Sequence, residues 1–568
     1  MARAILAPIE PGHRRVLALA WPALIGNRWL LLRILALSMG ASLMVLIQPY
    51  LSKVLIDQGA MAGNLRVLVG SCVFMLLTPL FGVFLESFNR FAHIDLSSQV
   101  LFRLRERVFG HLQDLPPAYY ARTGLGELFS RFDTDLAQIQ RLVVDSPLAM
   151  VGGIFNLALL TLLMGSLSTP LALLVLAVVP LQVAAAWIKR GDIENASREV
   201  RVRSAALSGY FLDSLRAVKF IQASNTQSAR LDGLRDHHRA YYLSLRASQR
   251  AGFVLSLLQR LAGTLGMAIV VGVGGWLLMQ HQTTVGVLVA FVSYAARASG
   301  PVNTLLGVFA GWQRARISLT RVAELMDSAP LRQAQAASSS VPGVCRGEVE
   351  FRGVDYRHDA EVWVLRDASF RIAAGSKTLL LGASGGGKST LADLLLCHCL
   401  PQAGAILLDG IDIADIDLGA LRRSVSVVEQ EPVFFPGTVA DNLRYVAPGA
   451  GDGEIRAAMA AAGLDLERVA PERQLGAASF ALSRGERMRL ALARAILQQP
   501  AVLVLDETTS SVDRTLALSI MGCVDRIFAG KTRIVISHDP LLAGAVDQVC
   551  VLRCGQVSTD SAELDDAA

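Results

Sequence analysis

A glycine-rich segment in the C-terminal half of the chain has residues that could bind the phosphate groups of a nucleotide. Residues 382–389 read Gly-Ala-Ser-Gly-Gly-Gly-Lys-Ser and match the pattern G-x-x-x-x-G-K-S/T. An apolar run at 378–381 precedes it and a helical run at 390–396 follows, which is the context that the motif requires. Glycines let successive backbone N–H groups curl around phosphates without a Cβ clash, and the helix N-terminus adds a favourable dipole. The predicted nucleotide ligands are Gly382, Ser384, Gly385, Gly386, Gly387, Lys388, Ser389 and Thr390.

Two adjacent acidic residues supply the second half of this predicted site. The apolar run 501–505 indicates a buried strand that ends in Asp506 and Glu507. We expect Asp506 to hold Mg²⁺ through water and Glu507 to polarise the attacking water, while Lys388 meets the β- and γ-phosphate oxygens and Ser389 ligates Mg²⁺. Two acids at a strand end can also cap a helix, but the upstream phosphate loop favours the catalytic interpretation. The expected cofactors are therefore ATP and Mg²⁺.

The N-terminal half of the chain has the composition of a membrane domain. The chain of 568 residues is 52% hydrophobic and only 18% charged, and the apolar excess lies in the first 310 residues. Six apolar stretches are each long enough to cross a hydrocarbon core of ~30 Å. They are residues 30–51, 65–88, 142–164, 170–188, 255–278 and 285–309. The net charge of +6 does not indicate a nucleic-acid partner, because the basic residues lie mostly between apolar stretches.

The distribution of Lys and Arg predicts the orientation in the membrane. The long loops 89–140 and 189–250 are rich in these residues, whereas the short connections 166–169 and 280–284 carry none. We therefore expect the termini and both long loops to be cytoplasmic, in a multi-pass protein of the inner (cytoplasmic) membrane. Apolar residues recur at helical spacing in the long loops, so the spans are predicted to continue as helices into the cytosol. Separate cytosolic helical hairpins are the alternative.

The sequence as a whole predicts four regions. Residues 1–28 show no secretory signal and are expected to form an amphipathic cytoplasmic elbow, followed at 29–326 by an all-α transmembrane domain of six helices. A helix is predicted at 312–326, and the composition of 327–343 is typical of a linker. Residues 344–568 alternate short β-branched runs with helical segments, which indicates an α/β domain. Its predicted strands lie at 349–351, 378–381, 405–408, 424–428, 501–505 and 533–536.

These motifs, in this order, resemble the ATP-binding cassette (ABC) superfamily, specifically exporters in which one membrane domain and one nucleotide-binding domain share a chain. The resemblance implies that Gln430 is the glutamine that senses Mg²⁺ and the pore. It also implies that Asp513 belongs to the D-loop and that His538 is the switch histidine. The segment 482–486, Leu-Ser-Arg-Gly-Glu, matches the family signature. Its Ser483 and Gly485 are implied to contact the γ-phosphate of ATP held by the opposite subunit.

The sequence departs from the family pattern at three places. Arg484 and Glu486 replace the glycine and the glutamine of the signature. The acidic loop that usually precedes the signature is missing at 476–479. The aromatic residue that stacks on adenine is normally Tyr, and alignment places His358 there, with Tyr356 as the alternative. Imidazole stacks less strongly than phenol, so this departure bears on adenine binding.

The resemblance also extends to the membrane half and to the function. Residues 119–135 and 211–219 look like the two intracellular loops that would dock on nucleotide-binding domains. A chain with one phosphate loop needs a second half-transporter subunit, and a homodimer is preferred to a heterodimer. The expected function is ATP-driven export of a hydrophobic, amphipathic or peptide-like substrate by alternating access. A lipid flippase and an ATP-gated channel or regulatory subunit are the alternatives. Candidate polar residues of the substrate cavity are Glu86, Asn89, Arg90, Arg297 and Asn303.

Overall fold

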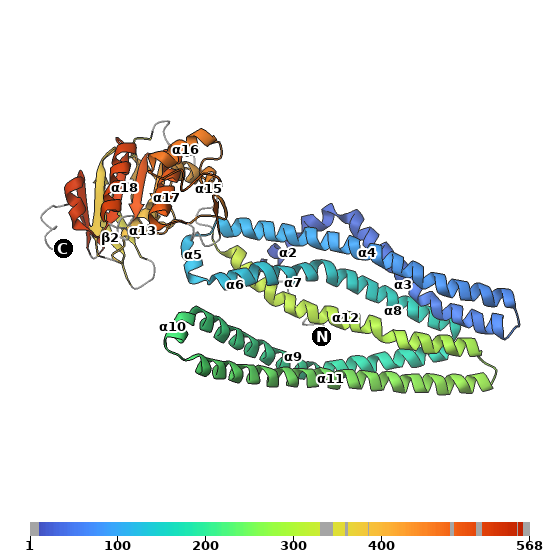
Figure 1. Cartoon of the computed structure of the whole chain (residues 1–568). Helices are drawn as coiled ribbons and strands as arrows, with labels where there is room; N and C mark the ends of the chain where they lie inside the picture. Colours follow the sequence, from blue (N-terminus) through green and yellow to red (C-terminus); the bar gives the residue numbers. More distant parts are fainter. Residues whose placement is uncertain are drawn as a thin grey trace. The chain divides into compact units, whose positions relative to one another are not determined.

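The structure is a computed structural model that describes residues 11–329, 345–357, 362–383, 385–476, 482–506, 514–553 and 555–559 (Figure 1). The chain divides into two compact units, which are treated separately below. The first comprises Met1–Gly110 and Gly126–Asp327 and is helical. The second comprises His111–Leu125 and Ser328–Ala568 and contains the β-sheets.

The helical unit contains six segments that are long and apolar enough to cross a membrane, which confirms the six predicted stretches. Their bounds are Arg28–Ala60, Leu65–Gln113, Leu125–Leu167, Thr169–Lys189, Gln227–Met279 and Val285–Asp327. Up to residue 145 the helices are α2 (Pro11–Gly26), α3 (Arg28–Val54), η1 (Leu55–Ala60), α4 (Leu65–Gln113), α5 (Pro117–Arg122), α6 (Leu125–Ser130), η2 (Arg131–Asp135), α7 (Leu136–Gln140) and η3 (Arg141–Asp145). Of these, α5 belongs to the second unit. The others are α8 (Ser146–Leu167), α9 (Thr169–Arg216), α10 (Val218–Ala223), α11 (Gln227–Met279) and α12 (Val285–Asp327).

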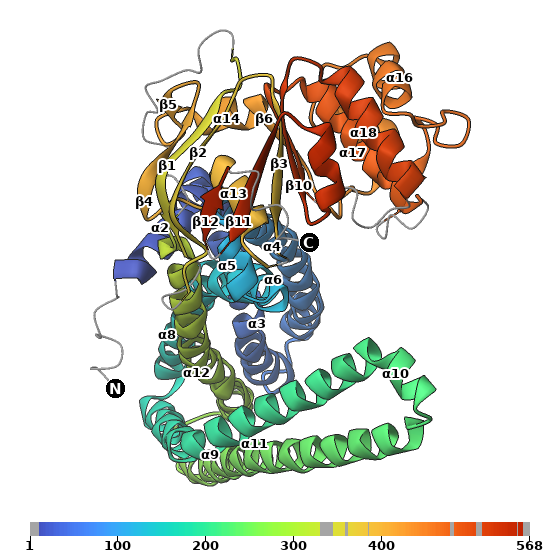
Figure 2. The ribbon, with the colours of Figure 1, turned by 90° about the vertical axis from the view of Figure 1, so that its left-hand side faces the viewer.

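Several helices continue far beyond the length of a membrane span, as the sequence predicted. Helix α4 has 49 residues and α11 has 53, so each is more than twice as long as the ~20 residues that a bilayer requires. Helices α9 and α11 pack along one another and are joined through the short α10 (Figure 2). The helix expected at 312–326 is the last part of the single helix α12. Neither Gly311, which lies between the predicted span and this helix, nor Pro301 interrupts α12.

The segment expected to be an elbow forms α2, and its apolar face packs against α12. Val16, Ala20 and Ala23 recur at helical spacing and are fully buried. At the polar end, the His13 ring lies 2.9 Å from Thr320 Oγ1, and Arg15 pairs with Asp327 at 3.0 Å. The segment is therefore fixed to the C-terminal part of α12.

The second unit contains a larger sheet that is parallel except for β12, which runs antiparallel to β11, and a smaller antiparallel sheet, which agrees with the predicted α/β domain. The larger sheet has the strand order β12-β11-β3-β10-β9-β6, and the other described sheets have the orders β2-β1-β4-β5 and β7-β8. The strands are β1 (Val349–Tyr356), β2 (Leu365–Ile372), β3 (Lys377–Gly382), β4 (Ala403–Leu408), β5 (Ile411–Asp412), β6 (Val425–Val428), β7 (Gly437–Thr438), β8 (Gln474–Leu475), β9 (Val502–Asp506), β10 (Thr532–Ser537), β11 (Gln548–Arg553) and β12 (Gln556–Ser558). The helices are α13 (Lys388–Leu395), α14 (Leu418–Ser424), α15 (Val439–Arg444), α16 (Asp452–Ala461), α17 (Arg484–Gln498), α18 (Arg514–Ile527) and η4 (Pro540–Ala545).

The central strands of the larger sheet are apolar on both faces because each face carries its own core. Leu379 and Leu381 of β3 belong to one cluster of buried residues, and Leu380 belongs to the other. Strand β9 divides in the same way, with Leu503 on one face and Val504 on the other. A parallel strand covered on both faces reads as a continuous apolar run, which is why these strands were predictable from the sequence.

Candidate functional site

The pairing of the parallel strands places the candidate catalytic residues at one edge of the sheet. Ile536 of β10 pairs with Leu380 of β3 on one side and with Asp506 of β9 on the other. The strand ends at Gly382, Asp506 and Ser537 are therefore neighbours, and His538 directly follows β10. Gln430 lies two residues after Val428, the end of β6, which pairs with Leu505 of β9. Ligands bind at the carboxyl ends of the strands in sheets of this kind.

The glycines of the phosphate loop have conformations that other residues rarely adopt. Gly385 and Gly387 have φ values of +77° and +96°. A Cβ on Gly387 would also lie 2.5 Å from Val364 Cγ1, and one on Gly382 would lie 2.7 Å from the Leu552 carbonyl oxygen. Residues with a Cβ would therefore be strained or would clash at these positions of the loop. The Gly386 N–H donates to the Ala383 carbonyl at 3.1 Å, which makes the turn tighter.

The Lys388 side chain lies across this loop. It is only 4% exposed, and its Nζ donates to the carbonyl oxygens of Gly382 and Ala383 at 2.8 and 2.9 Å. These carbonyls fix the ammonium group at the first turn of α13, next to the loop N–H groups. Ser389 is exposed at the same turn and Thr390 is buried. A fixed cation and N–H groups at a helix N-terminus form a place for an anion such as a phosphate group.

The turn after β10 holds His538 in place. Ser537 is buried, and its hydroxyl accepts a hydrogen bond from the Asp539 N–H at 3.0 Å. The Asp539 carboxylate in turn accepts from the Leu541 N–H at 3.0 Å and caps η4. His538 lies between these two anchored residues and is exposed at the edge of the sheet. Gln430 is also exposed, and Asp506 is half-buried.

The candidate signature residues begin helix α17 with a reciprocal pair of hydrogen bonds. The Ser483 N–H donates to Glu486 Oε2 at 2.7 Å, and the Glu486 N–H donates to Ser483 Oγ at 3.2 Å. This capping box satisfies N–H groups that the first helical turn leaves unpaired. Ser483 and Arg484 are exposed and Gly485 is half-buried, so the hydroxyl and the following backbone N–H groups face outward at the start of the helix.

Glu486, one of the departures from the family pattern, has a structural partner. Its Oε1 lies 2.9 Å from Arg468 Nε. Burial disfavours the carboxylate, but the hydrogen bonds from Ser483 and the charges of Arg468 and Arg473 outweigh this effect and lower the pKa of Glu486. The acid therefore stabilises the start of the signature helix in its ionised form.

Of the two residues considered for adenine stacking, the structure describes Tyr356 but not His358. Tyr356 is only 6% exposed, and its hydroxyl hydrogen-bonds the Cys399 side chain, so its ring lies in the core and not at the surface. Burial raises the pKa of this phenol. His358 lies outside the described residues, as do Ser384, Glu507 and Asp513. The roles of these four residues remain predictions.

Trp363 is an aromatic residue near the phosphate loop that the sequence analysis did not identify. Its side chain is exposed, and the Arg357 guanidinium lies 4.8 Å from the centre of its ring. The next residue, Val364, is the one that approaches Gly387 of the phosphate loop. An exposed aromatic ring beside the loop is suited to stacking on a base. The only sequence signal was a tryptophan five positions after His358, without a motif to mark it.

Arg494 is a second residue that the sequence analysis missed, and it joins the signature helix to the segment after Gln430. Its Nη1 donates to the Val433 carbonyl at 2.6 Å, and its Nε and Nη2 donate to the carbonyl and Oδ1 of Asn442 at 3.1 and 2.8 Å. The guanidinium carbon also lies 4.4 Å from the centre of the Phe434 ring. Burial lowers the pKa of Arg494. The arginine fixes the segment that follows the candidate Mg²⁺ sensor.

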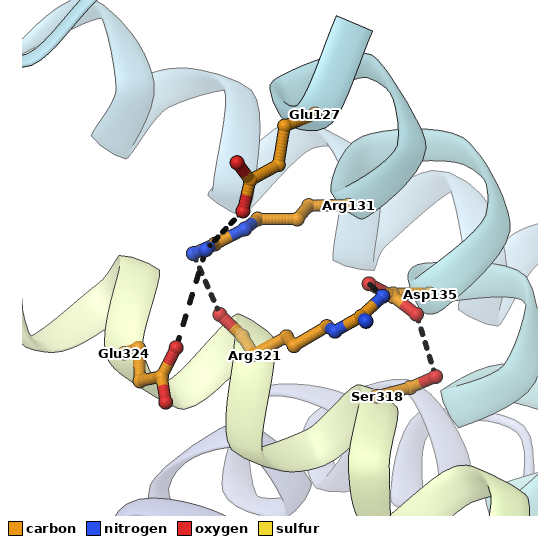
Figure 3. A network of polar contacts seen from close by, with 6 residues as sticks. All are labelled: Glu127, Arg131, Asp135, Ser318, Arg321 and Glu324. Atoms are coloured by element: carbon orange, nitrogen blue, oxygen red, sulfur yellow. Dashed lines mark hydrogen bonds and ion pairs between the residues drawn. The ribbon is translucent and has the colours of Figure 1, made fainter. Parts of the chain in front are cut away.

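A polar network in the helical unit joins the first loop region to the sixth spanning helix (Figure 3). Arg131 donates to Glu127 at 2.7 Å and to the Arg321 carbonyl at 3.2 Å, and it lies 4.0 Å from Glu324. One turn further, the buried Asp135 accepts from the Ser318 hydroxyl at 2.7 Å. Glu127, Arg131 and Asp135 lie in the stretch that resembles the first intracellular loop, and their partners lie in α12. A displacement of this loop would therefore be transmitted to α12.

Comparisons with known proteins agree with this arrangement. Residues 31–302 match the ABC transporter transmembrane region and residues 365–510 match the ABC transporter family. The chain is 29% identical to the ATP-dependent lipid A-core flippase of Bordetella pertussis, over 81% of this chain and 75% of that protein. It is 30% identical to the multidrug efflux ATP-binding/permease protein of Mycobacterium bovis, over 92% of this chain and 44% of that protein.

The fold is also found in a solved structure. The chain is similar to a bacterial Atm1-family ABC exporter with ATP bound, with a TM-score of 0.79 and 23% sequence identity. The similarity covers 94% of each chain, so it extends over both the spanning helices and the sheet-containing unit.

Proposed function

The chain belongs to the ABC transporters, which are ATPases coupled to the movement of a substrate across a membrane, and from this premise we propose that two copies of it form an exporter. The exporter carries a hydrophobic, amphipathic or peptide-like substrate across the cytoplasmic membrane by alternating access. The observation that supports this function is the convergence of Gly382, Asp506 and His538 at neighbouring strand ends.

One chain supplies one phosphate loop and one signature, so two chains complete two ATP sites. The exposed Ser483 at the start of α17 is directed outward with the N–H groups of that helix turn, which suits contact with a phosphate held by another subunit. A symmetric pair also fits the retention of Glu507 and His538 in the sequence. The partner is therefore a second copy of this chain.

The chain's own residues have distinct roles in hydrolysis. Lys388 and the loop N–H groups hold the phosphates, and Glu507 orients the attacking water. His538, fixed between Ser537 and Asp539, stabilises charge at the γ-phosphate. Ser389, Gln430 and Asp506 offer oxygen ligands of the kind that Mg²⁺ prefers, and the ion would neutralise phosphate charge there.

ATP binding closes the two nucleotide-binding domains, and hydrolysis allows them to separate. The network of Arg131, Asp135 and Ser318 gives the first intracellular loop a rigid connection to α12. Through this connection the closure of the domains turns the spanning helices from an inward-open to an outward-open arrangement. A flippase is the second candidate, because a relative with that activity matches 81% of this chain.

A complementation experiment tests whether the ATP sites are shared between two copies. Lys388→Ala damages the phosphate loop and Ser483→Arg damages the signature, so either variant alone has two defective sites in a homodimer. Coexpression with two different affinity tags yields a heterodimer in which the defects fall together in one site and the other site is intact.

We expect tandem-purified heterodimers in nanodiscs to recover ATPase activity well above either homodimer. Wild-type chains carrying the same two tags serve as the reference, and thermal unfolding shows whether Ser483→Arg folds, since loss of this helix cap costs about 1 kcal/mol. A heterodimer as inactive as the single variants would contradict the shared sites.

A further inference from the structure

The helical unit contains a cavity of about 670 Å³ between α3, α4, α8 and α12. This volume lies within the roughly 300–1,000 Å³ of cavities that bind small molecules. The lining combines apolar side chains from α3 and α8 with polar side chains from all four helices and from η3. The polar lining residues are Ser38, Ser42, Asn89, His93, Asp145, Asn156, Arg297 and Thr304.

Arg297 contributes a positive charge at membrane depth. It lies 12 residues after Val285, the outer end of α12, and therefore about 18 Å into a hydrocarbon core of ~30 Å. Its guanidinium Nη2 donates to Gln48 Oε1 at 3.1 Å, and among the described residues it has no carboxylate within ion-pair distance. A neutral amide orients the guanidinium but leaves its charge uncompensated, which is costly at this depth.

The acidic residue of the cavity wall already has partners. Asp145 Oδ1 lies 3.3 Å from His93 Nε2 and accepts a hydrogen bond from Gln140 Nε2 at 3.1 Å. These contacts hold the carboxylate at the cytosolic end of α8, away from Arg297. The cavity therefore has a guanidinium that lacks a counter-ion, and the acid at its other end does not supply one.

A second polar atom of the wall has no partner. Asn89 Oδ1 is buried and, in the part of the chain that the structure describes, accepts no hydrogen bond. Asn156, by contrast, donates to Ser42 Oγ at 3.0 Å. This oxygen is not accessible to solvent, so its missing partner is a cost within the helix packing and not a contact for a molecule in the cavity. The apolar side chains of the lining come from α3 and α8 and are Ile34, Leu35, Val45, Leu46, Leu148 and Leu160.

We infer that this cavity binds an amphiphile with an anionic headgroup. A phosphate, sulfate or carboxylate group pairs with Arg297, and the hydrocarbon part lies against the apolar side chains of the lining. This inference rests on the proposed function and names the substrate class for it. The shared chemistry is the anionic headgroup, whether the amphiphile is a membrane lipid or enters from water.

Equilibrium binding to the full-length protein in nanodiscs of neutral lipid tests the charge requirement. The probes are radiolabelled dodecyl phosphate, dodecylphosphocholine and dodecyltrimethylammonium, with inorganic phosphate as the anion without a chain. We expect only dodecyl phosphate to bind tightly and to stimulate the ATPase. A second arm places labelled phosphatidic acid in the bilayer. Saturable binding there assigns a lipid source, and binding of dodecyl phosphate alone assigns a water-borne one.

Substitutions at Arg297 and at its partner Gln48 test the role of Arg297 in different ways. Arg297→Gln should weaken dodecyl phosphate binding by about tenfold to a hundredfold, because a charge-assisted hydrogen bond is lost, and Arg297→Lys should restore part of it. Gln48→Glu keeps Arg297 but provides an internal carboxylate, and it should weaken binding to a similar extent. The matched control is Arg260→Gln, an exposed arginine of α11 outside the cavity, which should bind as the wild type does.

Equal binding of anionic, zwitterionic and cationic chains would overturn the inference, as would unchanged binding in both Arg297→Gln and Gln48→Glu. Binding of inorganic phosphate with the same affinity would overturn the requirement for an amphiphile. These outcomes are separate from failure of the proposed function, because binding is measured without ATP. A protein that binds dodecyl phosphate but lacks ATP-dependent transport would retain the site and contradict the exporter.

Discussion

Replacing Arg494 should weaken both the nucleotide-binding unit and its catalysis. In Arg494→Met the side chain keeps its apolar length but loses the three hydrogen bonds to Val433 and Asn442. Hydrogen bonds from a charged donor contribute about 1.5–3 kcal/mol each, and they are not additive within one side chain. Asn442 is buried, so its two acceptor oxygens would lose this donor away from water, whereas the Val433 carbonyl belongs to an exposed residue; we expect a loss of about 3 kcal/mol in the free energy of unfolding.

For a unit of this size, 1 kcal/mol corresponds to roughly 2–4 °C, so the melting temperature of the sheet-containing unit should fall by about 6–12 °C. Arg494→Lys keeps the charge and one donor direction, and we expect about half of this loss. The assay is differential scanning calorimetry of the full-length protein in nanodiscs at one fixed scan rate.

Turnover should fall as well, because the segment after Gln430 would no longer be fixed to α17. Nucleotide affinity should stay within about twofold, since the phosphate loop is untouched. Arg487→Met provides a matched control, because this arginine lies on the same helix, whereas the hydrogen bond to the Val433 carbonyl comes from Arg494. An unchanged melting temperature in Arg494→Met would refute the reasoning.

Two further sites give quantitative expectations. Gly385→Ala and Gly387→Ala both place a side chain in left-handed backbone, which costs about 1–2 kcal/mol, but only at Gly387 would the Cβ also meet Val364, at 2.5 Å. Equilibrium dialysis with a non-hydrolysable ATP analogue should show the greater loss for Gly387→Ala, and equal losses would contradict the loop geometry. Asp409 is partly buried, which opposes its charge, but the Cys345 thiol and the N–H groups of Arg346, Gly347 and Glu348 outweigh burial and lower its pKa. Its stabilising contribution is therefore full above the ordinary aspartate pKa of about 3.9 and is lost as the pH falls through the lower folded-state pKa. Asp409→Asn should cost about 1 kcal/mol at neutral pH after allowance for solvent screening, and a melting curve measured from pH 7 to 3 should show a smaller acid dependence than in the wild type.

Local patterns in the sequence predicted the elements that lie around the nucleotide site. The phosphate loop is recognisable because its glycines and Lys388 are adjacent in sequence, and strands β3 and β9 are continuous apolar runs. Strand β2 was not predicted, because Leu365–Ile372 alternates buried residues with Arg and Asp and resembles a loop. Strand β11 also escaped detection. Its position becomes clear only through its pairing with β3, in which Gln548 pairs with Thr378, 170 positions earlier in the chain.

Contacts between distant residues were beyond the reach of sequence patterns. Helix α17 carries several arginines, and the sequence does not distinguish the exposed Arg484 from Arg494, because their difference depends on which carbonyls lie opposite. The burial of Tyr356 follows from its contact with Cys399, 43 positions later. The pairing of Arg297 with Gln48 rather than with an acid joins the first and sixth spans in the same way.

Transport by Glu507→Gln tests the central claim most directly, because it distinguishes a motor from a gate. The substitution keeps the shape of the side chain but removes the carboxylate that we propose orients the attacking water, an expected loss of about 3–4 kcal/mol in the transition state and thus ~10²–10³ in turnover. The measurement is flux of labelled dodecyl phosphate across proteoliposomes with saturating Mg-ATP, with retained nucleotide counted in the same sample. We predict trapped ATP and no net transport, whereas sustained downhill flux through the ATP-loaded variant would contradict the exporter.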